Sequence, residues 1–295
     1  MERFWLERRN TQVSVHGGVM FRRLGLYLTV LGALAVVSAA SAAYPSPFAI
    51  QGGQGVLSND GSIRYVAVGT GEGTVVRASK TTGGSRVMSS QSIPGSYGVP
   101  MLTASGPGGG MFRDGSTFVL QSTGLFATTQ FVLLGTADLS VRDQIVLKGT
   151  FAFDALSPDG SKLYLIQHKS KDDIQHYIVR AYDLSAHQLM PGRIADKAQK
   201  SWVMKGWTID RATTATGRWV YTLYANPGGF PFIHALDTVK GVAHCVGVPW
   251  PQSDSNQSKV FNFKLALRGK MLVIKQGSGS TYRVVNTTNW HVSKP

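Results

Sequence analysis

Three residues in the middle of the chain, Asp154, Trp207 and Arg211, have side chains that could bind a small polar ligand. Asp154 and Arg211 each lie six residues before the glycine of a predicted hairpin turn. If that position lies on the innermost strand of successive repeat units, the two charges come from adjacent units and meet near a common axis. A structural ion pair and two unrelated surface charges are the alternatives, and a register error of one residue would turn each side chain to the other face. The same count from the other turns gives Gly55, Gly109 and Phe263.

The sequence contains no recognisable set of catalytic residues. A glycosidase needs two carboxylates at a defined separation, one of them with a raised pKa. Glu72 is the one glutamate after residue 7, and it lies in a glycine-rich loop. Combinations of aspartates alone remain open. No Gly-x-Ser-x-Gly element precedes a predicted helix, and Gly277–Gly279 reads as a hairpin loop.

Metal and cofactor sites are not expected either. The histidines show neither HExxH nor His-x-His spacing, and the glycine-rich run at 106–110 lacks the Gly-Lys-Ser/Thr end of a phosphate loop. Cys245 is the single cysteine and lies in an apolar, strand-like segment, so we expect a buried, unreactive thiol.

Composition points to β-structure and to an anionic partner. Glycine is abundant (34 residues) and glutamate is nearly absent, whereas β-branched and aromatic residues suit a pleated, half-buried surface.

The formal charge is +14, and the chain without residues 1–43 keeps 25 basic and 14 acidic residues, a net charge of +11. Such a surface favours an anionic cell-envelope polymer, while a solvated surface of scattered charge is the alternative. No basic–aromatic platform indicates specific nucleic-acid binding. Trp202, Trp207 and Trp250, in predicted loops, could contact carbohydrate or another protein.

The amino terminus predicts export. Arg22 and Arg23 precede an apolar run from Leu24 to Ala40 and small residues up to residue 43, as in a secretory signal peptide over residues 20–43. An uncleaved anchor is the alternative, and it would be the one contact with a membrane. Residues 1–19 precede a complete signal, and we interpret them as an upstream mis-start or an extended n-region.

A turn-and-strand unit recurs five times in the remaining chain. Its landmark is a turn ending in glycine and followed by an apolar strand, and a second landmark is a strand ending in a polar turn. One unit therefore holds four strands in about 50 residues, which is the size of a propeller blade. The turn glycines are Gly61, Gly115, Gly160, Gly217 and Gly269.

These repeats predict one all-β domain over residues 44–295, a β-propeller of about five four-stranded blades. We place the units at about 48–100, 101–150, 151–200, 201–250 and 251–295. The extended segment at 47–50 is left over, and we expect it to pair into the last blade and close the ring, because closure removes exposed edges. An open β-sandwich and two small sheets are the alternatives.

Two stretches also carry a family resemblance. Residues 154–165 read DALSPDGSKLYL and residues 179–184 read VRAYDL. The pattern resembles the YVTN/WD40-like repeat families, over residues 151–247 above all, and the whole resembles uncharacterised exported propeller proteins of high-GC Gram-positive bacteria. The resemblance implies fold. Sugar lactonases occur among YVTN-like proteins, but with seven blades and a longer chain.

The sequence as a whole favours an exported, monomeric, non-catalytic module that binds a protein, a carbohydrate or an anionic envelope polymer outside the cytoplasmic membrane. The alternative is an extracytoplasmic, lactonase-like hydrolase with its site at the channel mouth.

Overall fold

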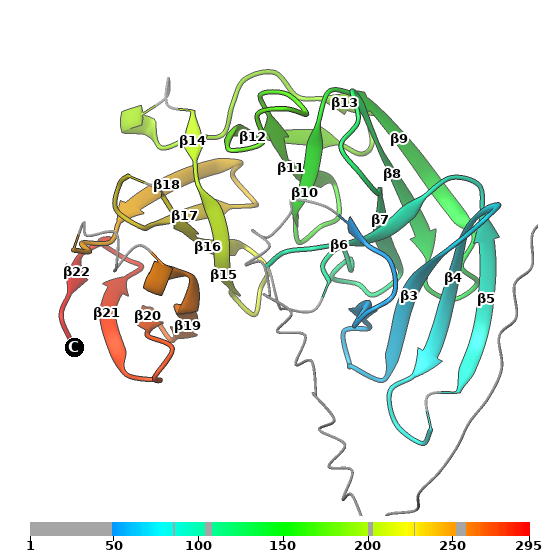
Figure 1. The fold of residues 1–295 in the computed structure, drawn as a ribbon, viewed down its shortest axis with the longest axis horizontal. Coiled ribbons are helices and arrows are strands. Elements are labelled where there is room, and N and C mark those ends of the chain that lie inside the picture. Colours follow the sequence, from blue (N-terminus) through cyan, green and yellow to red (C-terminus); the bar gives the residue numbers. More distant parts are fainter. Residues whose placement is uncertain (1–48, 85, 104–107, 200–202, 227, 252–257) are drawn as a thin grey trace, which may run out of the picture. The chain divides into compact units, whose positions relative to one another are not determined.

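The computed structural model describes residues 49–84, 86–103, 108–199, 203–226, 228–251 and 258–295. The predicted signal segment, the preceding residues and Trp202 lie outside these ranges. The described chain is almost entirely β-structure, in five antiparallel sheets, each built from one continuous stretch of sequence apart from the short β1 (Figure 1). This is the all-β propeller architecture that the repeats predict. In the part of the chain that is described, no helix is long and apolar enough to cross a membrane.

The first two sheets cover residues 49–148. Sheet 1 has the strand order β2–β3–β4–β5, and sheet 2 the order β1–β6–β7–β8–β9. Their strands are β1 (Ala49–Ile50), β2 (Val56–Leu57), β3 (Ile63–Thr70), β4 (Gly73–Lys80), β5 (Val87–Ile93), β6 (Tyr97–Pro100), β7 (Thr117–Ser122), β8 (Thr128–Gly135) and β9 (Val141–Lys148).

The other three sheets follow in chain order. Sheet 3 consists of β10 (Phe151–Leu156), β11 (Lys162–His168), β12 (His176–Asp183) and β13 (Gln188–Leu189), with β14 (Met204–Lys205) also paired to β12. Sheet 4 consists of β15 (Trp207–Thr213), β16 (Trp219–Ala225), β17 (Phe232–Asp237) and β18 (Val242–Gly247). Sheet 5 consists of β19 (Lys264–Arg268), β20 (Met271–Lys275), β21 (Thr281–Asn286) and β22 (Val292–Ser293). Two short 3-10 helices, η1 (Lys197–Gln199) and η2 (Ser258–Asn262), lie in the connections.

The predicted turn glycines all have the left-handed conformation that a tight turn requires. At Gly160 φ is +69°, and the other four range from +58° to +74°. In the third copy the carboxylate of Asp159 accepts the backbone N–H of Ser161 at 3.0 Å, a local bond that replaces a strand partner and fixes the bend. Asp60 and Asp114 do the same in the first two copies.

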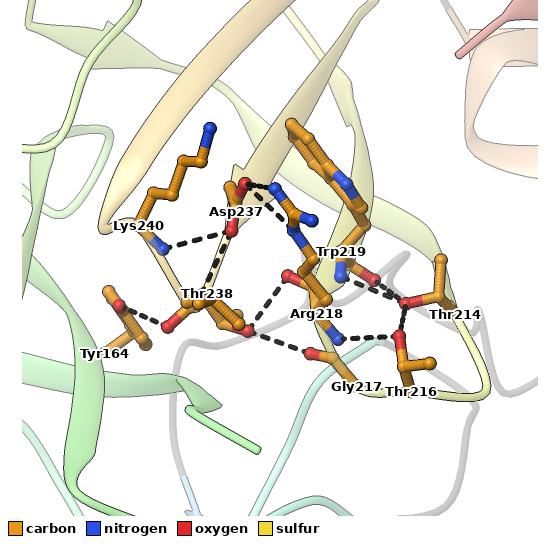
Figure 2. Close-up of polar contacts among 10 residues, drawn as sticks. Tyr164, Thr214, Thr216, Gly217, Arg218, Trp219, Asp237, Thr238 and Lys240 are labelled. Carbon is orange, nitrogen blue, oxygen red and sulfur yellow. Dashed lines mark hydrogen bonds and ion pairs between the residues drawn. The ribbon is translucent and has the colours of Figure 1, made fainter. Parts of the chain in front are cut away.

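In each unit, a second hydrogen bond joins the residue after the third strand to the first turn, and this residue is a threonine in four of the five units. In sheet 4 the N–H of Thr238 donates to the carbonyl of Arg218 at 2.8 Å, and its hydroxyl donates to the carbonyl of Gly217 at 2.9 Å (Figure 2). The third strand of the sheet is thereby tied to the first turn. Thr81, Thr136, Thr287 and, through its N–H alone, Leu184 occupy the equivalent place.

Four of the contacts between successive sheets are buried apolar clusters. They join sheet 1 to sheet 2, sheet 2 to sheet 3, sheet 3 to sheet 4 and sheet 4 to sheet 5. Packing on both faces explains why the middle strands read as continuous apolar runs rather than as alternating ones. Among the residues that the structure describes, no buried cluster joins sheet 5 to sheet 1.

The expected place of the N-terminal strand is wrong. Ala49 and Ile50 pair with Pro100 and Val99 of β6, not with the last sheet. Sheet 5 needs no outside strand, because its own β22 pairs with β21. The approach to β6 depends on Gly98, where an added Cβ would lie 2.5 Å from the carbonyl oxygen of Ile50.

Candidate functional site

Residues from four sheets line one hollow of about 310 Å³, which we call the axial pocket. Its wall comes from the first strands of sheets 1, 3 and 4 and from the segment between β6 and β7 of sheet 2. Arg113, from that segment, crosses to the turn of sheet 4, where its Nη1 donates to the carbonyl of Ala215 at 2.8 Å. The wall is mostly apolar. It includes Leu57, Leu102, Gly109, Met111, Arg113, Phe153, Asp154, Leu156, Pro158, Arg211, Thr213 and Val220.

The predicted pair of Asp154 and Arg211 lies at this pocket. Arg211 Nη2 donates to Asp154 Oδ1 at 2.8 Å, and the two side chains are 9% and 3% exposed. Asp154 is the residue skipped by the register shift between Phe153 and Ala155, and β15 is shifted in the same way just before Asp210. Bulges of this kind re-aim a side chain, so the two irregular strands bring the charges together.

A smaller cavity of about 40 Å³ lies between sheets 3 and 4, and we call it the inner chamber. It shares Leu102, Phe153, Asp154 and Arg211 with the axial pocket, so the ion pair lines both hollows. The remaining wall includes Ala152, Ile166, His168, Tyr177, Trp207, Thr208, Thr222 and Tyr224.

Two polar atoms of the chamber residues are buried without a hydrogen-bond partner, Nε2 of His168 and the hydroxyl of Tyr177. The side chains are 6% and 3% exposed. Burial lowers the pKa of His168 to about 4, and burial raises the pKa of Tyr177 and of Tyr224. At neutral pH all three side chains are therefore uncharged.

A second polar group lies beside the chamber. His234, on β17, is 1% exposed, and its Nδ1 lies 3.5 Å from Cys245 Sγ. Burial lowers the pKa of His234 to about 4 and raises the pKa of the Cys245 thiol to about 12. The thiol is thus protonated and a poor nucleophile. Asp196 joins this group to sheet 3, since its carboxylate accepts the N–H of Cys245 at 2.9 Å.

The sequence-predicted residues fall into two groups. Asp154, Arg211 and Trp207 line the inner chamber together, although Trp207, expected in a loop, begins β15 and is buried. Trp250, expected in a contact surface, is instead 7% exposed and packs against Phe263 and Tyr282. Phe263, expected on an inner strand, belongs to the same core between sheets 4 and 5.

Neither His168 nor Tyr177 was assigned to the ligand site from the sequence. Alternation along β11 could have identified the histidine, because Tyr164, Ile166 and His168 share one face of that strand. Tyr177 could be identified only from the pairing register of β11 and β12, which places it opposite His168. Glu72 lies in the two-residue turn between β3 and β4, away from both hollows. Within the described ranges, no group of three or more His, Cys, Asp or Glu side chains is placed to hold a metal ion.

Comparison with known proteins finds likeness in structure but not in sequence. No family model and no curated protein matches the chain. Hydrazine synthase from Kuenenia stuttgartiensis superimposes with a TM-score of 0.50 at 14% identity, over 79% of this chain and 63% of that chain. The Dos1 propeller gives 0.48 at 8% identity, over 81% and 57%. TolB from Acinetobacter baumannii gives 0.43 at 11% identity, over 80% and 52%. This chain thus spans less than two thirds of each of them, and at these identities the likeness concerns the fold alone.

Proposed function

We propose that this chain is a non-catalytic β-propeller module that binds a small ligand in the axial pocket, outside the cytoplasmic membrane. One observation carries the proposal. The first strands of sheets 1, 3 and 4 and the β6–β7 connection of sheet 2 line a single hollow of about 310 Å³, and a buried, hydrogen-bonded ion pair lies in its wall. A largely apolar, preformed cavity with a few convergent polar groups is typical of a small-molecule site.

The state of the polar groups favours binding over catalysis. Asp154 already accepts a hydrogen bond from Arg211, and His168 has a pKa of about 4, well below neutral. A general base works best with a pKa near the working pH. The described residues of the two hollows therefore supply hydrogen bonds and apolar contacts more readily than proton transfer.

The extracytoplasmic location rests on the amino-terminal sequence and on the family resemblance. The basic pair, the apolar run and the small residues up to position 43 have the order of a secretory signal. The DALSPDGSKLYL stretch resembles the YVTN/WD40-like repeat families, and the whole resembles exported propeller proteins of high-GC Gram-positive bacteria. The net charge of +11 after that segment suits a cell envelope, where many polymers are anionic.

A binding screen with a blocked pocket tests the proposal. Thr213 is an exposed residue of the pocket wall, so Thr213→Trp should fill the hollow with little cost to the fold. Thr82 is exposed in the turn after β4, and Thr82→Trp is the matched control. We expect ligand-observed NMR to find sugars, small carboxylates or amines that bind the wild type and Thr82→Trp at millimolar concentration or below, and that do not bind Thr213→Trp.

Two outcomes would contradict it. Binding that survives in Thr213→Trp would place the site elsewhere. Hydrolysis of lactone or ester probes by the wild type, lost in Thr213→Trp, would show that the pocket belongs to the hydrolase alternative.

A further inference from the structure

The inner chamber presents a hydrogen-bond acceptor, and the tautomer of His168 establishes this. Nδ1 of His168 lies 2.8 Å from the carbonyl oxygen of Ile174. A carbonyl can only accept, so Nδ1 carries the proton, and in a neutral imidazole Nε2 is then a bare lone pair. That lone pair has no partner among the described residues, although the side chain is 94% buried.

The hydroxyl of Tyr177 supplies the complementary group. The rings of Tyr177 and His168 meet edge to face with centroids 5.9 Å apart, on neighbouring strands in direct register. The hydroxyl can donate or accept, and it makes no hydrogen bond of good geometry in the described structure, although the Tyr224 side chain lies near it and adds to the effect of burial in raising its pKa. Buried polar atoms of folded proteins nearly always have partners, so an unpaired acceptor beside an unpaired hydroxyl indicates an occupant that both can bond.

The charge of the chamber decides which occupant fits. Asp154 and Arg211 compensate each other, and His168 is neutral, so the chamber carries no net charge. A cation would be repelled by Arg211, and a carboxylate would meet Asp154 and the lone pair of His168. Burying either ion in so small a space is costly, whereas a neutral O–H group can donate to Nε2 and accept from Tyr177.

The volumes of the two hollows indicate which part of a ligand each can hold. A cavity of about 40 Å³ has room for a hydroxyl or a water but not for a ring. The adjoining axial pocket, at about 310 Å³, has room for a small ring compound. Phe153 lines both hollows, so its ring can contact the C–H groups of a sugar or cyclitol held in the axial pocket.

We infer that the axial pocket takes a neutral, hydroxyl-bearing compound of the sugar or polyol class. One of its hydroxyls enters the inner chamber, donates to His168 Nε2 and accepts from Tyr177. The inference rests on the proposed function and adds the class of ligand to it.

The test compares six-membered rings that differ in their polar groups. The purified full chain is titrated by calorimetry with myo-inositol and D-glucose, and separately with cyclohexanecarboxylate and cyclohexylammonium. We expect one or both polyols to bind and both ions to fail. In Tyr177→Phe polyol binding should weaken about three- to tenfold, the loss of one hydrogen bond between neutral groups.

Tyr65→Phe is the control, since Tyr65 is also buried but lies in sheet 1, away from the chamber. Thermal unfolding without ligand checks that Tyr177→Phe folds, which we expect because the hydroxyl makes no hydrogen bond of good geometry in the described structure. Polyol binding that is equal in the wild type and Tyr177→Phe would overturn the inference. Binding of the carboxylate or the ammonium alone would overturn it and leave the proposed function standing. Failure of all four compounds and of the wider screen would overturn both.

Discussion

Sheet 4 packs against two neighbours, and its two interfaces differ in chemistry. The interface with sheet 5 is one continuous cluster of fifteen buried apolar residues, with Trp250, Phe263 and Tyr282 in edge-to-face or tilted contact. The interface with sheet 3 has two clusters of only five each. Between and beside them lie the ion pair of Asp154 and Arg211, the histidines and the inner chamber.

Because side chains alternate along a strand, neighbouring residues of one strand contribute to the two different interfaces. On β17 Ile233 and Ala235 face sheet 5, whereas Phe232, His234 and Leu236 face sheet 3. A propeller needs only the apolar kind of interface to hold its blades together. Burying charges and imidazoles costs free energy, so the ion pair and the two histidines at this interface support the inner chamber as the polar end of the proposed ligand site.

Acidification should give the largest effect and should act on the interface between sheets 3 and 4. His168 and His234 both have a folded pKa of about 4, against an ordinary 6.5, so the unfolded chain binds protons that the folded chain does not. The free energy of unfolding therefore has its full value above pH 6.5. It decreases as the pH falls to 4, by on the order of 3 kcal/mol for each histidine. Urea unfolding at pH 7 and pH 4.5 measures the loss.

Variants separate this effect from the acidity of other groups. His234→Leu should remove about half of the loss, while His291→Asn, at an exposed position between β21 and β22, should leave it unchanged. Asp60 and Asp159, whose pKa is lowered to about 2 chiefly by hydrogen bonds from Ser58 and Ser157, titrate below this range. A stability that stays constant between pH 7 and pH 4.5 would show that the histidines are not buried as neutral groups.

Removing one member of the ion pair should give the next largest effect. Arg211→Ala leaves the carboxylate of Asp154, 3% exposed, without its cation, and breaking a buried pair in this way costs about 3–5 kcal/mol. Chemical denaturation of the variant measures the loss directly.

The double variant Asp154→Leu with Arg211→Met is the control, because replacing both charges by apolar groups of similar size is often close to neutral. If Arg211→Ala and the wild type have the same urea midpoint of unfolding, water already solvates the ion pair in the folded protein. The interface would then be less different from its apolar counterpart than the described packing indicates.

The repeats predicted the fold, but local irregularity limited the prediction of the site. Turn glycines are readable because only a positive φ makes glycine necessary, and all five have it. The same spacing brought Asp154 and Arg211 to one place. It failed for Phe263, because sheet 5 begins with a 3-10 helix and a short strand, so that the residue points into the core.

Other features depend on contacts that no local pattern records. The N-terminal strand has apolar residues that suit any sheet edge, and its choice of β6 follows from a close approach at Gly98. The chamber requires His168 and Tyr177 from one sheet to face residues of another. Neither alternation nor composition specifies how two sheets are aligned when they pack.

The smallest effect should come from one hydroxyl at each interface. Tyr164, fully buried, donates to the carbonyl of Thr238 at 2.7 Å and ties sheet 3 to the turn of sheet 4 (Figure 2). Tyr282 donates to the carbonyl of Pro249 at 2.6 Å, but at the exposed margin of the other interface. Losing the buried bond leaves an acceptor away from water, so we expect Tyr164→Phe to cost about 1–2 kcal/mol and Tyr282→Phe less than about 0.5 kcal/mol, where water replaces the donor. Urea unfolding of the two variants side by side gives the difference, and equal losses would mean that the carbonyl of Thr238 is solvated as well.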